Sequence, residues 1–343
     1  MAKEIQHNFL SIDKASLLKS LGEEKLRAAL EQMVLIRQLE TRAESGYQQG
    51  KIGGFFHAYM GQEAIQTAAV DVMGVDQWWI TTYRCHALAL LTGASPDEIM
   101  AEFYGKATGN AKGRGGSMHL YTDTLLGGFG IVGGHLPIAT GAAFSIKYQN
   151  QKDKVAVCFL GDGAVAQGAV HESLNLAALW DLPCIYVVEN NQWGMGTAVN
   201  RALAAQPIAE HLAKAYGLES MTLDGMDFFN CHEGFSQAFE KVKATSRPII
   251  IEAVTERFRG HSISDPGLYR SKEELEAAKQ RDPITQLVEE MKGAKMITDE
   301  EFEQMKKAAT EKVKAAMKFA DESPDPDVAT LEEGVFAPED SDG

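Results

Sequence analysis

The segment Gly161-Asp162-Gly163 places a carboxylate between two glycines. It directly follows 155–160, an apolar stretch that predicts a buried strand. A strand that ends in glycines and leads into a helix is a common anion-binding site. A carboxylate beside a bound phosphate is repulsive unless a cation lies between them. The segment therefore predicts a phosphate-containing ligand that is held together with a metal ion.

A second polar segment, 189–194, follows the next predicted strand and contains Asn190 and Asn191. Asparagine amides and free backbone carbonyls are neutral oxygen donors, which suit Mg²⁺. A carboxylate, an amide oxygen, a main-chain carbonyl, phosphate oxygens and water would complete an octahedron around the ion. The turn that follows the strand 155–160 carries neither GxGxxG nor GxxxxGK[ST], which argues against a dinucleotide-dependent oxidoreductase and against a P-loop enzyme.

These segments are positioned by a predicted βαβ unit in an α/β fold with a central, mostly parallel sheet flanked by helices. Both strands of the unit, 155–160 and 184–188, are continuous apolar runs, as in a parallel sheet that is covered on both faces. The segments 78–82 and 248–254 predict further strands.

Helical extensions are predicted at both ends of the chain. Apolar residues recur at helical spacing from Glu23 to Gln48. Two more helices are predicted, from about Ser271 to Lys292 and from Thr298 to about Ala320. The stretch from Arg257 to Tyr269 is rich in glycine and serine and predicts a long loop.

The chain therefore divides into three predicted regions. Residues 1–50 form an N-terminal segment with a packing helix, and 51–320 form the α/β domain with its C-terminal helices. Residues 321–343 carry nine acidic residues, no basic residue and interspersed prolines, and this composition predicts a flexible tail.

The overall composition excludes several classes of protein. A net charge of −15 argues against binding to nucleic acid, which requires clustered Lys and Arg. No apolar run is long enough to span a membrane and no signal peptide begins the chain, so we expect a cytoplasmic protein without a membrane partner. The four cysteines are widely spaced without CxxC, so we expect reduced thiols.

Two glycine-rich segments, 112–119 and 127–134, precede the βαβ unit. Glycines let main-chain groups approach a ligand closely, which predicts a binding role here. A mobile linker is the alternative, but Ile131 and Val132 suit burial.

At this point the residues resemble a known family. Gly161-Asp162-Gly163, followed after twenty-six residues by Asn190-Asn191, is similar to the signature of thiamine diphosphate enzymes. The chain resembles the alpha subunits of 2-oxo acid dehydrogenases from about Leu26 to Ala320. The resemblance is carried by the segments 56–64, 83–86, 115–119, 130–133, 224–227 and 260–262.

The resemblance implies a complete set of groups for the metal and the diphosphate. Asp162 and Asn191 would bind Mg²⁺ through their side chains, and Trp193 would bind it through its carbonyl oxygen. The diphosphate would be held by the side chains of Tyr83, Arg84 and His261 and by the backbone N–H groups of Gly163 and Ala164. A surface salt bridge is the alternative role for Arg84, and an ordinary exposed loop histidine is the alternative for His261.

The resemblance also implies contacts to the rest of the cofactor. The backbone at Gly130 and Val132 would meet the aminopyrimidine ring and help to bend the cofactor. His57 and His119 resemble pocket histidines, and we expect His57 to lie near the reacting centre, with His261 and His119 as further catalytic candidates. Either His57 or His119 could instead be a packed, hydrogen-bonded histidine.

A partner chain is implied as well. The cofactor needs a carboxylate on its pyrimidine nitrogen, and in this family that glutamate belongs to a beta subunit. We therefore expect two alpha and two beta chains, together with a lipoyl-bearing acyltransferase. Tyr269 and Arg270 resemble the part of the loop that meets the lipoyl domain. Ser262 and Ser264 match positions that are phosphorylated in some members.

Pyruvate is the favoured substrate among small 2-oxo acids, because 61–63 and 264–267 look most like the pyruvate subunit. Acetoin and branched-chain 2-oxo acid dehydrogenases are the alternatives, and a non-catalytic, partner-binding subunit is an alternative of another class. The intact Asp162, Asn191 and His261 argue against the last. Ala166 and Arg259 depart from the family pattern without removing a metal ligand.

Overall fold

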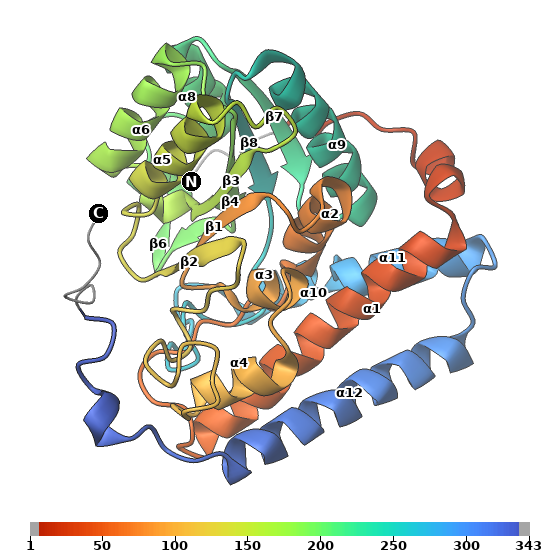
Figure 1. Cartoon of the computed structure of the whole chain (residues 1–343). Coiled ribbons are helices and arrows are strands. Elements are labelled where there is room, and N and C mark those ends of the chain that lie inside the picture. The colour runs from red at the N-terminus through yellow and green to blue at the C-terminus, as the bar shows by residue number, and fades with distance from the viewer. Residues whose placement is uncertain (1–6, 336–343) are drawn as a thin grey trace.

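The computed structural model describes residues 7–335, which form a parallel sheet with helices on both faces (Figure 1). The strands of the sheet are β1 (Trp78–Thr82), β2 (Leu125–Phe129), β3 (Ala156–Gly161), β4 (Cys184–Asn190), β7 (Glu219–Asp224) and β8 (Ile249–Val254). Within the described residues their order is β2-β1-β3-β4-β8-β7, and every neighbouring pair is parallel. The predicted α/β fold and its strands are confirmed. A short antiparallel pair, β5 (Trp193–Gly194) and β6 (Thr197–Ala198), follows β4.

Helices pack on both faces of the sheet. One face carries α5 (Leu136–Tyr148), α6 (Gly168–Leu179) and α8 (Ile208–Tyr216). The core on the other face is built with α1 (Lys14–Gln48), α2 (Glu63–Met73), α3 (His86–Leu91), α4 (Pro96–Phe103), α9 (Phe228–Thr245), α11 (Pro283–Gly293) and α12 (Asp299–Glu322). The shorter elements are α7 (Val199–Ala202), α10 (Lys272–Gln280) and the 3-10 turns η1 (Asp162–Ala164) and η2 (Val328–Thr330).

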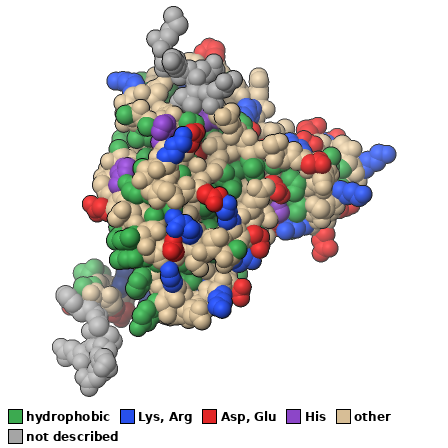
Figure 2. Space-filling model, turned by 90° about the horizontal axis from the view of Figure 1, so that it is seen from above, with side chains coloured by type: hydrophobic (Ala, Val, Ile, Leu, Met, Phe, Trp, Pro, Cys, Tyr) green, Lys and Arg blue, Asp and Glu red, His purple; other side chains and the backbone are tan. Residues whose placement is uncertain are grey.

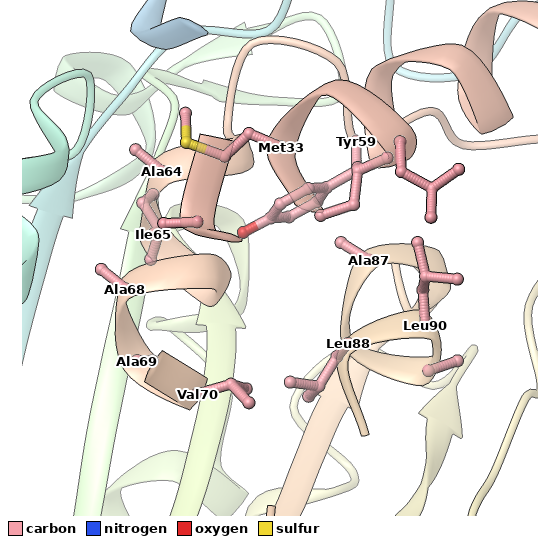
Figure 3. Close-up of a cluster of buried hydrophobic side chains, with 14 of the residues drawn as sticks. Met33, Tyr59, Ala64, Ile65, Ala68, Ala69, Val70, Ala87, Leu88 and Leu90 are labelled. Carbon is pink, nitrogen blue, oxygen red and sulfur yellow. The ribbon is translucent and has the colours of Figure 1, made fainter. Parts of the chain in front are cut away.

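The strands contribute side chains to two separate hydrophobic cores, because successive side chains point to opposite faces of the sheet. In β4, Ile185 and Val187 belong to the core with α1 and α2, whereas Tyr186 and Val188 belong to the core with α5 and α6. Figure 3 shows part of the first core, where the side chain of Met33 of α1 points toward Ala64 of α2. Burial on both faces explains why the sequence of β4 is continuously apolar.

The predicted terminal helices differ from the structure in one place. The N-terminal helix predicted from Glu23 to Gln48 is confirmed, and the non-helical backbone at Gly22 (φ 74°, ψ 170°) separates it from a short helix that begins at Lys14. The single helix predicted from Ser271 to Lys292 is wrong, because the chain breaks it into α10 and α11. Pro283 cannot continue α10, and Asp282 caps the start of α11 by accepting from the Thr285 N–H group. The helix after Thr298 is confirmed, and the Thr298 side chain caps it by accepting from the Glu301 N–H group.

The described part of the acidic C-terminal segment contacts the first glycine-rich segment. Asp325 pairs with Lys106, and the Arg114 guanidinium donates to the carbonyl oxygens of Thr330 and Glu333. Residues 336–343 of the predicted tail lie outside the described residues. Within 7–335, no helix is both long enough and apolar enough to cross a membrane.

Candidate cofactor-binding site

A cavity of about 580 Å³ opens at the carboxyl edge of β1, β3 and β4. It is bounded on one side by the loop that follows β8. All the residues predicted to bind the cofactor line it, namely His57, Tyr83, Arg84, Gly130, Val132, Asp162, Gly163, Ala164, Asn191, Trp193 and His261. The carboxyl edge of a parallel sheet is where α/β proteins bind ligands, because the strand ends and their loops converge there.

Asp162 lies directly after β3 with its side chain buried. Burial is the largest influence on this group and raises its pKa to about 6, although the charge of Arg257 opposes the shift. The expected helix start at Gly163 and Ala164 is wrong. These residues form the 3-10 turn η1, and α6 begins only at Gly168. Their N–H groups therefore belong to a tight turn rather than to the end of a helix.

The predicted neutral metal ligands lie in the turn between β4 and β5. The Asn191 side chain is buried, and its Nδ2 donates to Gln62 at 3.1 Å, so its Oδ1 is the end left for a cation. The Trp193 carbonyl oxygen accepts from the Arg257 guanidinium at 3.1 Å, which competes with metal binding. A buried carboxylate beside an oriented amide oxygen fits a hard cation. Residues 7–335 contain no cluster of three or more His, Cys, Asp or Glu side chains that could hold a metal, so Mg²⁺ stays a prediction that rests on mixed oxygen donors.

Arg84 is buried at the end of β1, so the alternative of a surface salt bridge is excluded. Its guanidinium donates to the carbonyl oxygens of Ala58 and His261, each at 2.6 Å. Burial, and then the charge of Arg257, lower the pKa of Arg84 to about 10, so it keeps its charge at pH 7. Among the described residues neither Arg84 nor Arg257 forms a salt bridge with a carboxylate. The cavity therefore presents cationic groups that an anionic ligand would satisfy.

His57, Tyr83 and His261 form one aromatic cluster on the cavity wall. The ring centroid of His57 lies 4.3 Å from that of Tyr83 and 4.9 Å from that of His261. Burial, and then the charge of Arg84, lower the pKa of His57 to about 2, and the same two causes lower that of His261 to about 4. Both imidazoles are therefore neutral at pH 7 without a ligand. A bound anion would raise both pKa values.

The wall near Gly130 differs from the prediction in two ways. His119 does not line the cavity: its Nδ1 bonds the Gly128 carbonyl oxygen at 2.9 Å, and a Cβ on Gly130 would lie 3.3 Å from its ring. It supports the backbone at Gly130 from outside. The expectation that Ile131 and Val132 are buried is wrong, since they are 77% and 45% exposed. They lie beyond the edge strand β2, where the described chain has nothing to cover them.

The first glycine-rich segment binds a carboxylate of this same chain instead of a ligand. The fully buried Glu102 accepts backbone N–H groups from Ala111, Gly113, Gly115 and Gly116 at 2.7–3.1 Å. The glycines allow this close approach. The ligand-binding expectation for 112–116 is therefore wrong, although Met118, just after it, does line the cavity.

Sequence reasoning missed Arg257. It is buried, lines the cavity, and donates to the carbonyl oxygens of Trp193 and Met195 and to the Tyr269 hydroxyl. Its position just past the end of β8 was the available signal, because that edge of the sheet binds ligands. Tyr269 and Arg270 lie outside the cavity lining, and the Tyr269 ring lies 4.9 Å from the ring of Trp193.

The fold and the cavity together define a parallel α/β protein with a cavity at the carboxyl edge of its sheet, lined by two buried arginines and a buried aspartate. The model of the family described as "Dehydrogenase E1 component" matches residues 31–329. The chain belongs to this family, which depends on thiamine diphosphate.

Full-length relatives support this assignment. The chain is 42% identical over 325 residues to a pyruvate dehydrogenase E1 component subunit alpha from Rickettsia felis, covering 94% of this chain and 99% of that protein. It is 38% identical to a protein of the same name from Porphyra purpurea, covering 93% and 94%. It is 40% identical to another from Rhizobium meliloti, covering 90% and 89%.

Proposed function

We propose that this chain is the alpha subunit of a pyruvate dehydrogenase, which decarboxylates pyruvate oxidatively and acetylates a lipoyl group. The observation that carries the proposal is the convergence of Asp162, Asn191, Arg84 and His261 on one cavity in a chain of the E1 family. The names and coverage of the full-length relatives support pyruvate over acetoin and branched-chain 2-oxo acids.

In this proposal the chain binds the diphosphate end of the cofactor together with its metal ion. Arg84 and His261 bind the diphosphate, and Asp162, Asn191 and the Trp193 carbonyl bind Mg²⁺. Metal binding requires the Trp193 oxygen to share with, or release, the Arg257 guanidinium. Thiamine diphosphate, when bound, supplies the nucleophilic carbon and the electron sink for decarboxylation of a 2-oxo acid.

Other residues of the chain would contact the substrate and the pyrimidine ring. His57 reaches the cavity as a neutral imidazole, so it can accept or donate a hydrogen bond to the substrate without adding charge. Its Nδ1 is buried and has no hydrogen-bond partner among the described residues. The backbone at Gly130 and Val132 lines the same cavity and would meet the pyrimidine ring.

The proposal includes a beta subunit, in an assembly of two alpha and two beta chains. Within 7–335, only Asp162 and Glu189 bring carboxylates to the cavity lining, and both lie at the strand ends beside Asn191 rather than near Gly130. A carboxylate for the pyrimidine ring therefore has to come from elsewhere. The exposed Ile131 marks a surface beside the cavity that such a partner would cover.

A second apolar surface supports assembly with further chains. Phe144 and Tyr148 of α5, and Leu179 and Trp180 at the end of α6, are exposed apolar residues. They border a groove of about 380 Å³ and a neighbouring one of about 440 Å³. In Figure 2, hydrophobic side chains reach the left edge of the molecule, on the side where Figure 1 draws α5 and α6. Exposed clusters of this kind mark protein interfaces.

The loop after β8 is proposed to receive the lipoyl domain of the acyltransferase through Tyr269 and Arg270. Tyr269 is held by Asp265 and Arg257, while the Arg270 guanidinium lies 3.5 Å from Glu256. Engagement of the lipoyl domain requires Arg270 to leave Glu256. A loop that is ordered by such polar contacts can also exclude water from the cavity.

One experiment tests the proposal. The chain is co-expressed with its beta subunit, supplied with thiamine diphosphate and Mg²⁺, and assayed with pyruvate, acetoin and 2-oxoisovalerate. We expect turnover of pyruvate to exceed the other two. No turnover of any substrate would overturn the enzyme assignment, and full activity of the chain without a beta subunit would refute the divided site.

A further inference from the structure

Apart from the bond between Gln62 and Asn191, the segment Gly61-Gln62-Glu63 has no role in the site as described so far, and Gln62 is fully buried. Gln62 precedes α2 at the N-cap position but makes no side-chain cap bond to that helix. A buried glutamine amide is costly unless its polar atoms are used. Its Oε1 forms a hydrogen bond outside its own helix, whereas its Nε2 has no hydrogen-bond partner among the described residues.

The side chain of Gln62 bonds a proposed metal ligand. Its Oε1 accepts from Asn191 Nδ2 at 3.1 Å, across 129 positions of sequence. An asparagine amide can bind a cation only through its oxygen, and an unsupported amide can turn either end toward the ion. By engaging Nδ2, Gln62 selects the orientation in which Oδ1 is free. The remaining contact to Oδ1, from the Trp193 N–H group at 3.4 Å, is long and leaves that oxygen available.

The backbone at Gln62 is held in place by its two neighbours. Gly61 has φ +98°, and a Cβ there would lie 2.4 Å from the Glu256 carbonyl oxygen, so only glycine allows this approach. Glu63 accepts from the Gly61 N–H group at 3.0 Å and pairs with Arg37. Figure 3 shows α2, which begins at Glu63, anchored by Ala64 and Ile65 in the apolar core.

We infer that Gln62 is a positioning residue for the metal site: it fixes the Asn191 amide so that its oxygen faces the cation. This inference rests on the proposed magnesium site and adds a residue to it. Groups that orient metal ligands typically contribute about tenfold to a hundredfold in metal affinity. Because Gln62 lines no part of the cavity, its effect on the cofactor passes through Asn191.

The test measures binding of Mn²⁺ in the presence of thiamine diphosphate, by the electron paramagnetic resonance signal of free Mn²⁺. The protein is the complex of the full chain with its beta subunit. Gln62→Met keeps the side-chain size and removes the acceptor, and should weaken Mn²⁺ binding about tenfold or more. Gln77→Met is the matched control: Gln77 is also buried and hydrogen-bonded, to Met73 and Val155, and its loss should leave Mn²⁺ affinity unchanged.

Repeating the Gln62→Met substitution in an Asn191→Asp variant separates loss of amide orientation from general destabilisation of the protein. In Asn191→Asp both side-chain oxygens can bind a cation, so orientation no longer matters, and adding Gln62→Met should weaken Mn²⁺ binding by less than about threefold. If Gln62→Met fails to fold, Gln62→Glu is used instead, because it keeps an acceptor in place. Its Mn²⁺ affinity should stay within about threefold of wild type, and a larger loss would count against a positioning role.

Two results would overturn the inference: wild-type affinity in Gln62→Met, or a loss from Gln62→Met that is the same with and without the Asn191→Asp substitution. Failure of the wild-type complex to bind Mn²⁺ with thiamine diphosphate is a distinct result. It would overturn the proposed metal site, and this inference would fall with it.

Discussion

The buried Asp162 carboxylate should make the cofactor-free protein less stable than it would be with a neutral group there. Burial raises the pKa of Asp162 from 3.8 to about 6. Each pKa unit corresponds to about 1.4 kcal/mol, so ionising this group in the folded chain costs about 3 kcal/mol of stability at pH 8. Asp162→Asn removes the charge and nearly keeps the shape, and should recover most of that amount.

The direction of the pH dependence follows from the raised pKa. Between the unfolded pKa and the folded pKa the folded chain binds more protons, so stability is highest in acid and falls as pH rises from about 4 to 6. At pH 5 about half of the cost has developed. The stabilisation given by Asp162→Asn should therefore be larger at pH 8 than at pH 5, by about 1.5 kcal/mol.

Urea unfolding of the cofactor-free protein at both pH values measures this difference. The same samples with Mg²⁺ and thiamine diphosphate provide the functional arm: wild type should gain stability from the ligands, whereas Asp162→Asn should gain little. An Asp162→Asn variant that is no more stable than wild type at pH 8, or whose advantage is the same at both pH values, would refute the reasoning.

Further changes test other parts of the structure. Glu102→Gln should lower the free energy of unfolding by about 2 kcal/mol, because its amide nitrogen would face N–H donors; an unchanged urea midpoint would contradict this. Gly61→Ala should lower the melting temperature, because the new Cβ would clash with the Glu256 carbonyl oxygen. An unchanged melting temperature would show that the backbone at Glu256 can move to relieve the clash. Trp180→Glu should reduce assembly with partner chains in light scattering without unfolding the chain, and intact assembly would remove this surface from the interface. Arg270→Ala should impair lipoyl acetylation more than decarboxylation with an artificial acceptor. Equal losses in the two assays would refute the proposed contact of Arg270 with the lipoyl domain.

The sequence predicts those parts of the molecule whose cause is local. The βαβ unit around Asp162 follows from two apolar runs and a glycine turn, and the structure matches it. The break at Pro283 was also readable, because Asp-Pro marks a helix start, and the prediction of one helix across it ignored that signal.

Other features depend on contacts between distant positions and have no local signature. The bond between Gln62 and Asn191 and the folding of the 111–116 backbone around Glu102 are of this kind. The glycines did predict close approach at 112–116, but glycine cannot tell whether the approaching group is a ligand or a side chain of the same chain. The exposure of Ile131 could not be predicted from the sequence either, because an apolar residue suits a subunit interface as well as a core.

The charges of the cavity give a physical reason for the proposed division of the site between two chains. Arg84 and Arg257 are buried there, and within the described chain no carboxylate forms a salt bridge with either, which leaves their charge for a diphosphate. Placing the ring-activating glutamate in this chain would bring a further carboxylate into the same cavity while the chain folds without cofactor. That carboxylate could pair with the arginines and close the diphosphate site. Supplied by a beta subunit, it meets the pyrimidine end only after assembly, at a distance from the charges that bind phosphate.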